Sequence, residues 1–226
     1  MTIAALYVEH GGVYYEPGLD VEPWGLPERD ARQYAGPWAV VGHPPCQRWG
    51  RYWHGGPSAK VRKTKGDDGG CFAAALAAVR IWGGVLEHPE GSAAWLAFGL
   101  LAPRRFVGWE AAGDFRGWTC CVEQGHYGHR ARKATWLYAC GVSDLPSLAW
   151  GPSVQRVKLD EGFHSAEERA ERNAYLARVE AATGRTWCSP ERMGKREVAA
   201  TPPAFRDVLL EIARSVRAPA EARCAP

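Results

Sequence analysis

A cysteine and a glutamate stand at the ends of two predicted strands and are the clearest candidates for chemistry in the sequence. The run His43-Pro44-Pro45-Cys46-Gln47 follows the apolar segment 38–42, and Glu87 ends the apolar segment 85–87. Short apolar segments bounded by Gly and Pro are typical of buried parallel strands. Binding sites in open α/β sheets form outside the carboxyl ends of such strands, so we expect both side chains to face one pocket.

Both residues also have a structural interpretation. Cys46 could be a buried or incidental cysteine before a loop, and Glu87 could be a capping or ion-paired carboxylate. However, two prolines stiffen the backbone before Cys46, and an unpaired charge at the end of an apolar strand is costly. The types and places of the two residues therefore favour a thiol nucleophile and a carboxylic acid at one site.

A basic turn between the predicted strands 118–124 and 134–140 is the third candidate. It contains Arg130, Arg132 and Lys133, whose N–H groups suit a phosphate or the carbonyl edge of a base. The alternative is a solvated hairpin turn without a ligand.

The segment 47–70 is predicted to be a long loop rich in basic and aromatic side chains. These suit phosphate contact and base stacking, although a variable loop without function is the alternative. The side chains that favour binding are Arg48, Trp49, Arg51, Tyr52, Trp53, Lys60, Arg62, Lys63 and Lys65.

The elements that must position these residues alternate between strands and helices, which predicts an α/β fold. A strand, a helix and a strand at 38–42, 71–82 and 85–87 form a βαβ pattern. The other predicted elements are strands at 3–9, 13–15, 118–124 and 134–140, helices at 165–182 and 203–216, and a helical turn within 27–34 in the loop 16–37. The Ser-x-x-Glu start at Ser165 resembles a capping box.

Composition and length exclude several classes of protein. With 226 residues, 46% hydrophobic and 23% charged, the chain suits one globular domain, and a net charge of +3 excludes a uniformly basic nucleic-acid coat. No segment approaches the ~20 apolar residues of a membrane helix, and the N-terminus does not resemble a signal peptide. Seven cysteines without a Cys-x-x-Cys pair predict reduced thiols in a cytoplasm, and the spacing of His43, Cys46, His54 and Cys71 does not suit a zinc site.

These features, in this order, resemble the C5-cytosine DNA methyltransferases, above all their small phage-type members. Pro44-Pro45-Cys46-Gln47 resembles the nucleophile motif of that family, and Leu86-Glu87-His88-Pro89 resembles its Glu-Asn-Val or Glu-Asn-Pro motif, with His88 in place of Asn. The further matches are Gln124, Gly128, Lys133, Thr135, Leu145-Pro146-Ser147-Leu148 and Thr201-Pro202 with the helix that follows. Together they span roughly residues 38–150 and 195–216.

The resemblance implies a Rossmann-like, methyltransferase-type fold with a mainly parallel sheet and flanking helices. Residues 1–150 would form the catalytic core, and the helical segment 151–226 would return to it within a single domain. The implied cofactor is S-adenosylmethionine, but the first half of the fold is abbreviated and has no Phe-x-Gly-x-Gly loop. The residues expected to bind this cofactor are Glu9, Gly11, Gly12, Asp20 and Pro45.

The resemblance also implies a covalent mechanism on DNA. Cys46 would add to C6 of cytosine, Glu87 would protonate or hydrogen-bond N3, and Arg132 or Arg130 would hold the O2 carbonyl. Arg48 or Arg51 would lower the pKa of Cys46. The residues expected on DNA, whose target base must leave the duplex, are Gln47, Arg48, Trp53, Lys63, Lys65 and Lys133.

Two other functions are compatible with the same residues. One is modification of the pyrimidine C5 with a different donor, because the segment expected to bind the methyl donor is the most degenerate one. The other is a non-catalytic DNA-binding relative. The partner is DNA in each case, no membrane is expected, and the location would be the cytoplasm of a bacterial host if the chain is phage-encoded.

Overall fold

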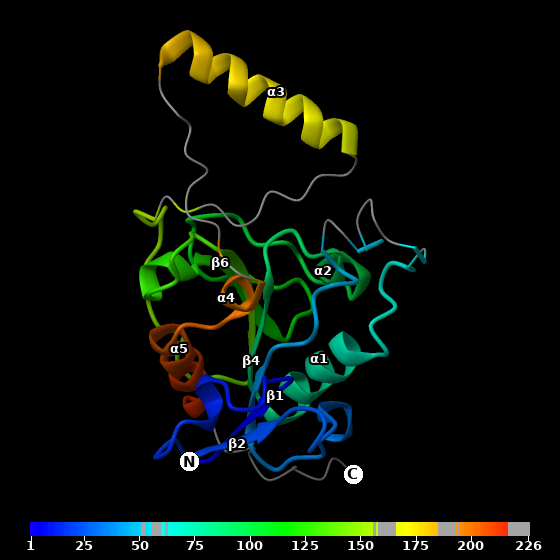
Figure 1. Cartoon of the computed structure of the whole chain (residues 1–226). Coiled ribbons are helices and arrows are strands. Elements are labelled where there is room, and N and C mark those ends of the chain that lie inside the picture. The colour runs from blue at the N-terminus through cyan, green and yellow to red at the C-terminus, as the bar shows by residue number, and fades with distance from the viewer. Residues whose placement is uncertain are drawn as a thin grey trace, which may run out of the picture.

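The computed structural model describes residues 1–50, 53–55, 60–61, 63–155, 157, 166–184, 193 and 195–216. In this part of the chain seven strands form one sheet in the order β2-β1-β3-β4-β7-β6-β5 (Figure 1). The strands are β1 (Ile3–Leu6), β2 (Val21–Trp24), β3 (Ala39–Gly42), β4 (Gly84–Pro89), β5 (Glu110–Ala111), β6 (Gly117–Glu123) and β7 (Ala134–Cys140).

The sheet is mixed in direction. The pairs β1–β2, β1–β3 and β3–β4 are parallel, whereas β4–β7, β6–β7 and β5–β6 are antiparallel. Only β5 and β7 therefore run against the other strands of the described sheet. The chain has the expected α/β class, and the carboxyl ends of β3, β4 and β6 meet the amino end of β7 at one edge.

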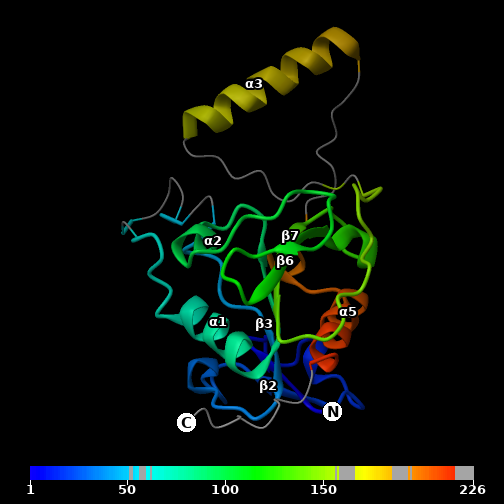
Figure 2. The same ribbon diagram turned by 180° about the vertical axis from the view of Figure 1, so that it is seen from behind.

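Helices cover both faces of this sheet. The α-helices are α1 (Cys71–Trp82), α2 (Ala93–Ala97), α3 (Ala166–Thr183), α4 (Lys195–Ala199) and α5 (Pro203–Arg214), and the 3-10 helices are η1 (Val13–Tyr15), η2 (Ala31–Gln33) and η3 (Gln124–Tyr127). Helices α1 and α5 lie on opposite sides of the strands (Figures 1 and 2).

Alternation along the strands divides the core into two layers. Leu6 and Val40 pack with Phe72 of α1, whereas Val41 and Val85 pack with Phe205 of α5. The two buried layers pack both faces of the central strands, and the carboxyl ends of β3, β4 and β6 position the candidate site.

Most predicted elements are confirmed by the structure. The predicted segments 71–82 and 134–140 match α1 and β7, and those at 38–42, 85–87, 118–124 and 203–216 match β3, β4, β6 and α5 within a few residues. The helical turn expected within 27–34 is η2. The helix predicted at 165–182 is α3, although its expected cap, Ser165, lies outside the described residues.

Two predictions near the N-terminus are wrong. Segment 13–15 is not a strand but the 3-10 turn η1, because the amide of Tyr15 donates to the Gly12 carbonyl (2.9 Å) and closes a turn. Within the predicted loop 16–37 the structure has β2, a half-buried edge strand. Pro23 lies in β2, and the sequence pattern therefore argued against a strand there.

Helix α5 packs against the sheet and reaches back to the N-terminal segment. Its Arg206 donates to the carbonyl oxygen of Val13 at 2.8 Å and pairs with Glu16. Among the described residues no helix is both long and apolar enough to cross a membrane.

Candidate functional site

The carboxylate of Glu87 is held from two sides at the carboxyl edge of β4. His43 Nδ1 lies 3.1 Å from Oε2, and Gln124 Nε2 donates to Oε1 at 3.2 Å. The side chains of His43 and Glu87 are each 12% exposed, so the pair is largely shielded but still reachable from solvent. Glu87 is thus ordered and hydrogen-bonded, with lone pairs left over for a ligand.

Neighbouring strands bring these residues together. His43 follows β3, which pairs with β4, and its amide donates to the Leu6 carbonyl of β1 (3.0 Å). Gln124 follows β6, and its Nε2 also donates to Thr135 Oγ1 of β7 (2.9 Å). Because the ends of β3, β4 and β6 share this edge, residues far apart in sequence form one cluster.

A buried tyrosine completes the hydrogen-bond chain. The Tyr14 hydroxyl lies 2.8 Å from His43 Nε2. Burial, reinforced by the negative charge of Glu87, raises the pKa of Tyr14 well above its ordinary value, so the hydroxyl stays protonated. Tyr14 therefore forms a neutral hydrogen-bond partner for Nε2, while His43 Nδ1–H donates to the carboxylate.

Glu87 is a carboxylate in the resting protein. Burial raises its pKa, but the hydrogen bond and charge of His43, with a smaller contribution from Lys133, outweigh burial and leave the pKa below its ordinary value. The group therefore accepts hydrogen bonds at neutral pH and does not provide a proton of its own.

Cys46 is half-buried in the turn that follows β3 and lies within electrostatic reach of Glu87. Burial raises the pKa of the Cys46 thiol, the charge of Glu87 raises it further, and the charge of Lys133 lowers it. The amides of Trp49 and Gly50 both donate to the Cys46 carbonyl at 3.0 Å, which fixes the turn that carries the thiol. The charge of Glu87 thus acts on a thiol that is 41 positions away in the sequence.

Lys133 provides the cation of this pocket. Its backbone has a positive φ of 42°, and its Nζ donates to the carbonyl oxygens of Ala199 (3.0 Å) and Ala200 (2.8 Å). Burial lowers the pKa of Lys133, whereas the charges of Glu87 and Cys46 oppose this shift. Lys133 was expected on DNA, and in the structure its charge also acts on the two candidate catalytic groups.

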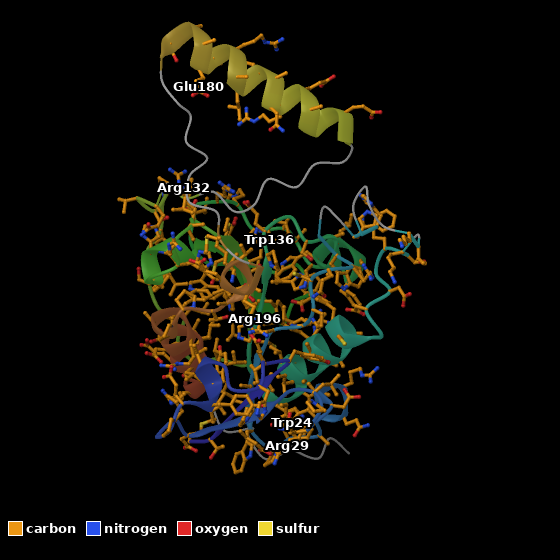
Figure 3. The ribbon with its side chains drawn as sticks, in the orientation of Figure 1. Trp24, Arg29, Arg132, Trp136, Glu180 and Arg196 are labelled. Atoms are coloured by element: carbon orange, nitrogen blue, oxygen red, sulfur yellow. The ribbon has the colours of Figure 1, made fainter. Side chains whose placement is uncertain are left out.

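The structure corrects the predicted roles of three arginines. Arg130 and Arg132 are both exposed, and Arg132 is labelled in Figure 3. Arg130 pairs with Glu197 at 2.6 Å, and Arg132 donates to the Gln155 carbonyl at 3.3 Å. Arg48 donates to the carbonyl of Trp53 (3.1 Å) rather than facing the Cys46 thiol. Each of the three guanidinium groups is thus engaged by a partner other than Cys46 or Glu87. Arg51, the other residue predicted to act on Cys46, lies outside the described residues.

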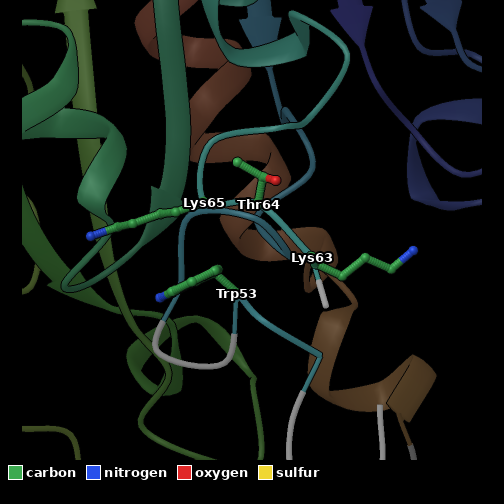
Figure 4. A pocket seen from close by; sticks show the side chains of 4 residues that line it. All are labelled: Trp53, Lys63, Thr64 and Lys65. Carbon is green, nitrogen blue, oxygen red and sulfur yellow. The ribbon is translucent and has the colours of Figure 1, made fainter. Parts of the chain in front are cut away.

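The basic loop forms an open hollow of its own. Trp53, Lys63, Thr64 and Lys65 line a hollow of about 440 Å³ (Figure 4). The base of the loop is closed by Gly66, whose amide donates to the Arg48 carbonyl at 2.9 Å. Three of the residues expected on DNA are therefore together, and the exposed Gln47 lies between them and Cys46 in the chain.

The residues predicted for S-adenosylmethionine do not form a nucleotide cradle. β1 is followed by the short turn η1, so no α-helix N-terminus faces its end. The side chain of Glu9 is 72% exposed, and the Gly12 amide donates to the Glu9 carbonyl (2.9 Å) within one tight turn. A Cβ on Gly25 would lie 2.1 Å from the Val8 carbonyl, so the ends of β1 and β2 touch.

Asp20 and Pro45, the other predicted cofactor residues, lie apart from each other. Asp20 precedes β2 at the amino edge of the sheet, where it accepts from the Thr2 hydroxyl (2.6 Å) and pairs with the N-terminus (3.0 Å). Asp20 is therefore not at the edge that holds Glu87, and its prediction is corrected. Pro45 directly precedes Cys46, so only this residue adjoins the pocket.

His88, which replaces the Asn of the resembled motif, has no place in the pocket. Successive strand residues face opposite sides, so His88 points into the core while Glu87 points to the site. Its Nδ1 lies 2.7 Å from Ser92 Oγ, and its ring stacks on Trp95 with centroids 6.2 Å apart. Burial lowers the pKa of His88 to about 4, which makes it a neutral core residue.

Sequence reasoning missed three members of the cluster as site residues. His43 belongs to the run that contains Cys46, and Gln124 is one of the positions that resemble the methyltransferase family. The sequence therefore indicated both residues, but neither was predicted to contact Glu87. Tyr14 had none, because its segment was interpreted as a strand. In the described residues no group of three or more His, Cys, Asp or Glu side chains is arranged to hold a metal ion.

No protein-family model matches this chain. The search of curated proteins also finds no significant match.

Proposed function

We propose that this chain is an enzyme of the DNA cytosine-C5 methyltransferase type, which activates the base by covalent addition of Cys46. The observation that supports this most directly is the electrostatic coupling of the Cys46 thiol with the Glu87 carboxylate and the Lys133 ammonium group, at the carboxyl ends of β3 and β4 and the amino end of β7. In this proposal the α/β sheet is a Rossmann-like methyltransferase core, and its carboxyl edge is the active site.

The first step makes C5 of cytosine nucleophilic. Cys46 loses its proton to solvent, and a bond forms between Sγ and C6 while the C5=C6 double bond opens toward C5. C5 then takes an electrophile, a proton in the simplest case. The original C5 hydrogen then leaves as a proton to solvent, any proton taken up at N3 is also returned to solvent, and cleavage of the Sγ–C6 bond restores the aromatic base and the thiolate.

Glu87 stabilises the activated base. As charge develops, N3 takes a proton from solvent, and the carboxylate accepts hydrogen bonds from N3–H and from the 4-amino group. The lowered pKa of Glu87 supports this role over direct proton donation. Lys133 favours the thiolate of Cys46 and is close enough to replace the predicted arginines at the O2 carbonyl.

The group that is finally transferred to C5 is a separate question. The residues predicted for S-adenosylmethionine do not converge on one site, because Asp20 pairs with the N-terminus before β2 and Glu9 lies exposed in the turn after β1, so no step of the mechanism is assigned to this cofactor. This observation favours the second candidate, C5 modification with another donor, over a standard methyl transfer. The activation chemistry of Cys46 and Glu87 is the same in both.

The basic hollow supports DNA as the macromolecule. A base can reach a half-buried thiol only after extrusion from its stack. Lys63 and Lys65 would contact the flanking phosphates, and Trp53 would stack in place of the extruded base.

Hydrogen exchange at C5 tests the activation step without any donor. DNA of mixed sequence is incubated with the protein in D₂O, digested, and its deoxycytidine is analysed by mass spectrometry. The wild-type protein should introduce deuterium at C5, and Cys46→Ser should not, because an alcohol is not ionised at neutral pH. Cys71→Ser, at another half-buried cysteine, is the matched control and should exchange normally. Exchange that persists in Cys46→Ser, or is absent in the wild type, contradicts the proposal.

A further inference from the structure

Tyr14, His43 and Glu87 form a continuous hydrogen-bond chain that the proposed chemistry does not itself require. The chain consists of the 2.8 Å contact between Tyr14 and His43 Nε2 and the 3.1 Å contact between His43 Nδ1 and Glu87. It connects three segments that lie 29 and 44 positions apart. A buried chain of this kind restricts both the position and the protonation of its last member.

The direction of the chain follows from the chemistry of its ends. A carboxylate only accepts, so His43 must present Nδ1–H to Glu87. The phenol of Tyr14 has both an O–H donor and an acceptor oxygen, so it can pair with Nε2 whether or not that nitrogen carries a proton. The carboxylate thus fixes a proton on Nδ1, and the contact with Tyr14 orients the ring.

Gln124 holds the other carboxylate oxygen. Its Nε2 donates to Glu87 Oε1 and to Thr135 Oγ1, so the amide is locked with nitrogen toward the carboxylate. Gln124 is completely buried, and a protonated Glu87 would have one oxygen fewer to accept from it. Both flanking side chains therefore match the ionised form of Glu87.

The returning helix α5 anchors the start of this chain. Arg206 donates to the Val13 carbonyl (2.8 Å), next to Tyr14, and its side chain is only 6% exposed. The turn that carries the Tyr14 hydroxyl is therefore fixed by the C-terminal part of the protein.

Several other titratable groups act on Glu87 and must be considered with His43. Lys133 approaches from the amino end of β7 and Cys46 from the turn after β3, whereas His88 acts only from the opposite face of β4. His88 is neutral at ordinary pH, and the Nζ of Lys133 is already engaged by two carbonyls. His43 is thus the group that donates directly to the carboxylate.

We propose that Tyr14 and His43 are positioning residues that, with Gln124, hold Glu87 as an ordered carboxylate with free lone pairs toward the base. This inference rests on the proposed function for the identity of the base, but the state of Glu87 is a property of the free protein. The carboxylate would favour a pyrimidine with an amino group at C4 and repel one with a carbonyl oxygen there.

A titration of the free protein tests the inference without catalysis. Protein labelled with ¹³C at the glutamate side-chain carboxyl is titrated by NMR, and Glu87 is assigned by comparison with Glu87→Gln. The wild-type midpoint should lie below the ordinary value of about 4.3. His43→Leu should raise it by at least about one unit, because burial is then no longer offset. His43→Asn, whose amide nitrogen takes the place of Nδ1 but carries no charge, should raise it by less than His43→Leu does.

A second variant keeps the test decisive if His43→Leu does not fold. Tyr14→Phe retains the ring but removes the hydroxyl partner of Nε2, and it should raise the midpoint by a smaller amount. An unchanged midpoint in the folded variants would overturn the inference, whether or not the protein exchanges cytosine hydrogen. If the wild type does exchange, the acid limb of its pH profile should move upward in the same variants, and exchange at deoxycytidine relative to deoxyuridine should fall. Wild-type protein without exchange would contradict the proposed function alone.

Discussion

The Nζ atom of Lys133 lies 2.8 Å from the carbonyl oxygen of Ala200, just before helix α5. This contact joins the pocket of Cys46 and Glu87 to the C-terminal segment. Since α5 also holds the turn of Tyr14 through Arg206, the C-terminal segment fixes the pocket at two separate points. A positive charge held in this way acts on the thiol at a constant position.

Lys133→Met should move the activity of the enzyme to higher pH. Lys133 lowers the pKa of Cys46, so its removal reduces the thiolate fraction at neutral pH. We expect deuterium exchange at pH 7 to fall about tenfold for each unit by which the thiol pKa rises, and to recover as pH increases. Lys133→Arg should retain more of the exchange, and Arg132→Ala, at the neighbouring exposed position, should behave as wild type. The same pH profile in wild type and Lys133→Met would contradict this role.

Glu87→Gln should bind DNA normally but exchange C5 hydrogen on the order of 10²-fold more slowly, as expected when a preorganised charged acceptor for the activated base is lost. The amide is isosteric, but it cannot accept from N3–H and the 4-amino group at both positions. Affinity measured by fluorescence anisotropy and exchange measured on the same DNA separate the two effects. Full exchange in this variant would show that Glu87 is only a structural partner of His43.

Neutralising the basic hollow should weaken DNA binding without regard to sequence. Replacing Lys63 and Lys65 with Gln removes two candidate phosphate contacts, and each lost contact should flatten the salt dependence of log K by about 0.9 on B-DNA. Anisotropy titrations at several salt concentrations measure this slope. Arg29→Ala is the control, because Arg29 lies over the Trp24 ring on β2, at the end of the sheet (Figure 3). Equal slopes in the double variant and the wild type would place the hollow away from DNA.

Trp53→Ala should affect catalysis more than affinity. The indole lines the hollow and would stabilise the extruded state by stacking, whereas the phosphate contacts remain. We expect the exchange rate to fall by a larger factor than the affinity for duplex DNA. A proportional loss of both would assign Trp53 to simple binding.

Protonation of His88 should destabilise the fold in acid. Its pKa is about 4 in the folded chain against 6.5 when exposed, so the unfolded state binds more protons between these values. The stabilisation is fully present above about pH 6.5 and is lost as pH falls toward 4, by about 2 kcal/mol at pH 5. Urea unfolding at pH 7 and pH 5 measures the loss in free energy of unfolding between the two pH values. This loss should be about 2 kcal/mol smaller in His88→Phe than in the wild type. An equal pH dependence in both proteins would contradict the prediction.

The sequence by itself determined the elements whose signals are local. Helix α1 follows from its alanine-rich run and the terminating Gly83, whose φ of 77° suits glycine at a helix end. Strand β7 follows from an apolar run that is buried along most of its length. Because strands β3 and β4 belong to one βαβ unit, the common edge of Cys46 and Glu87 was also predictable.

Only the tertiary structure decided which polar side chains join them. Arg130, Arg132 and Lys133 are equivalent in a sequence, but the positive φ of Lys133 and the carbonyls of Ala199 and Ala200 turn the lysine inward, while Glu197 and the Gln155 carbonyl hold the arginines outside. Tyr14 reaches His43 because a hydrogen bond at Gly12 closes a turn where the residue pattern suggests a strand. Such choices depend on partners distant in sequence, and hydrophobic periodicity contains no information about them.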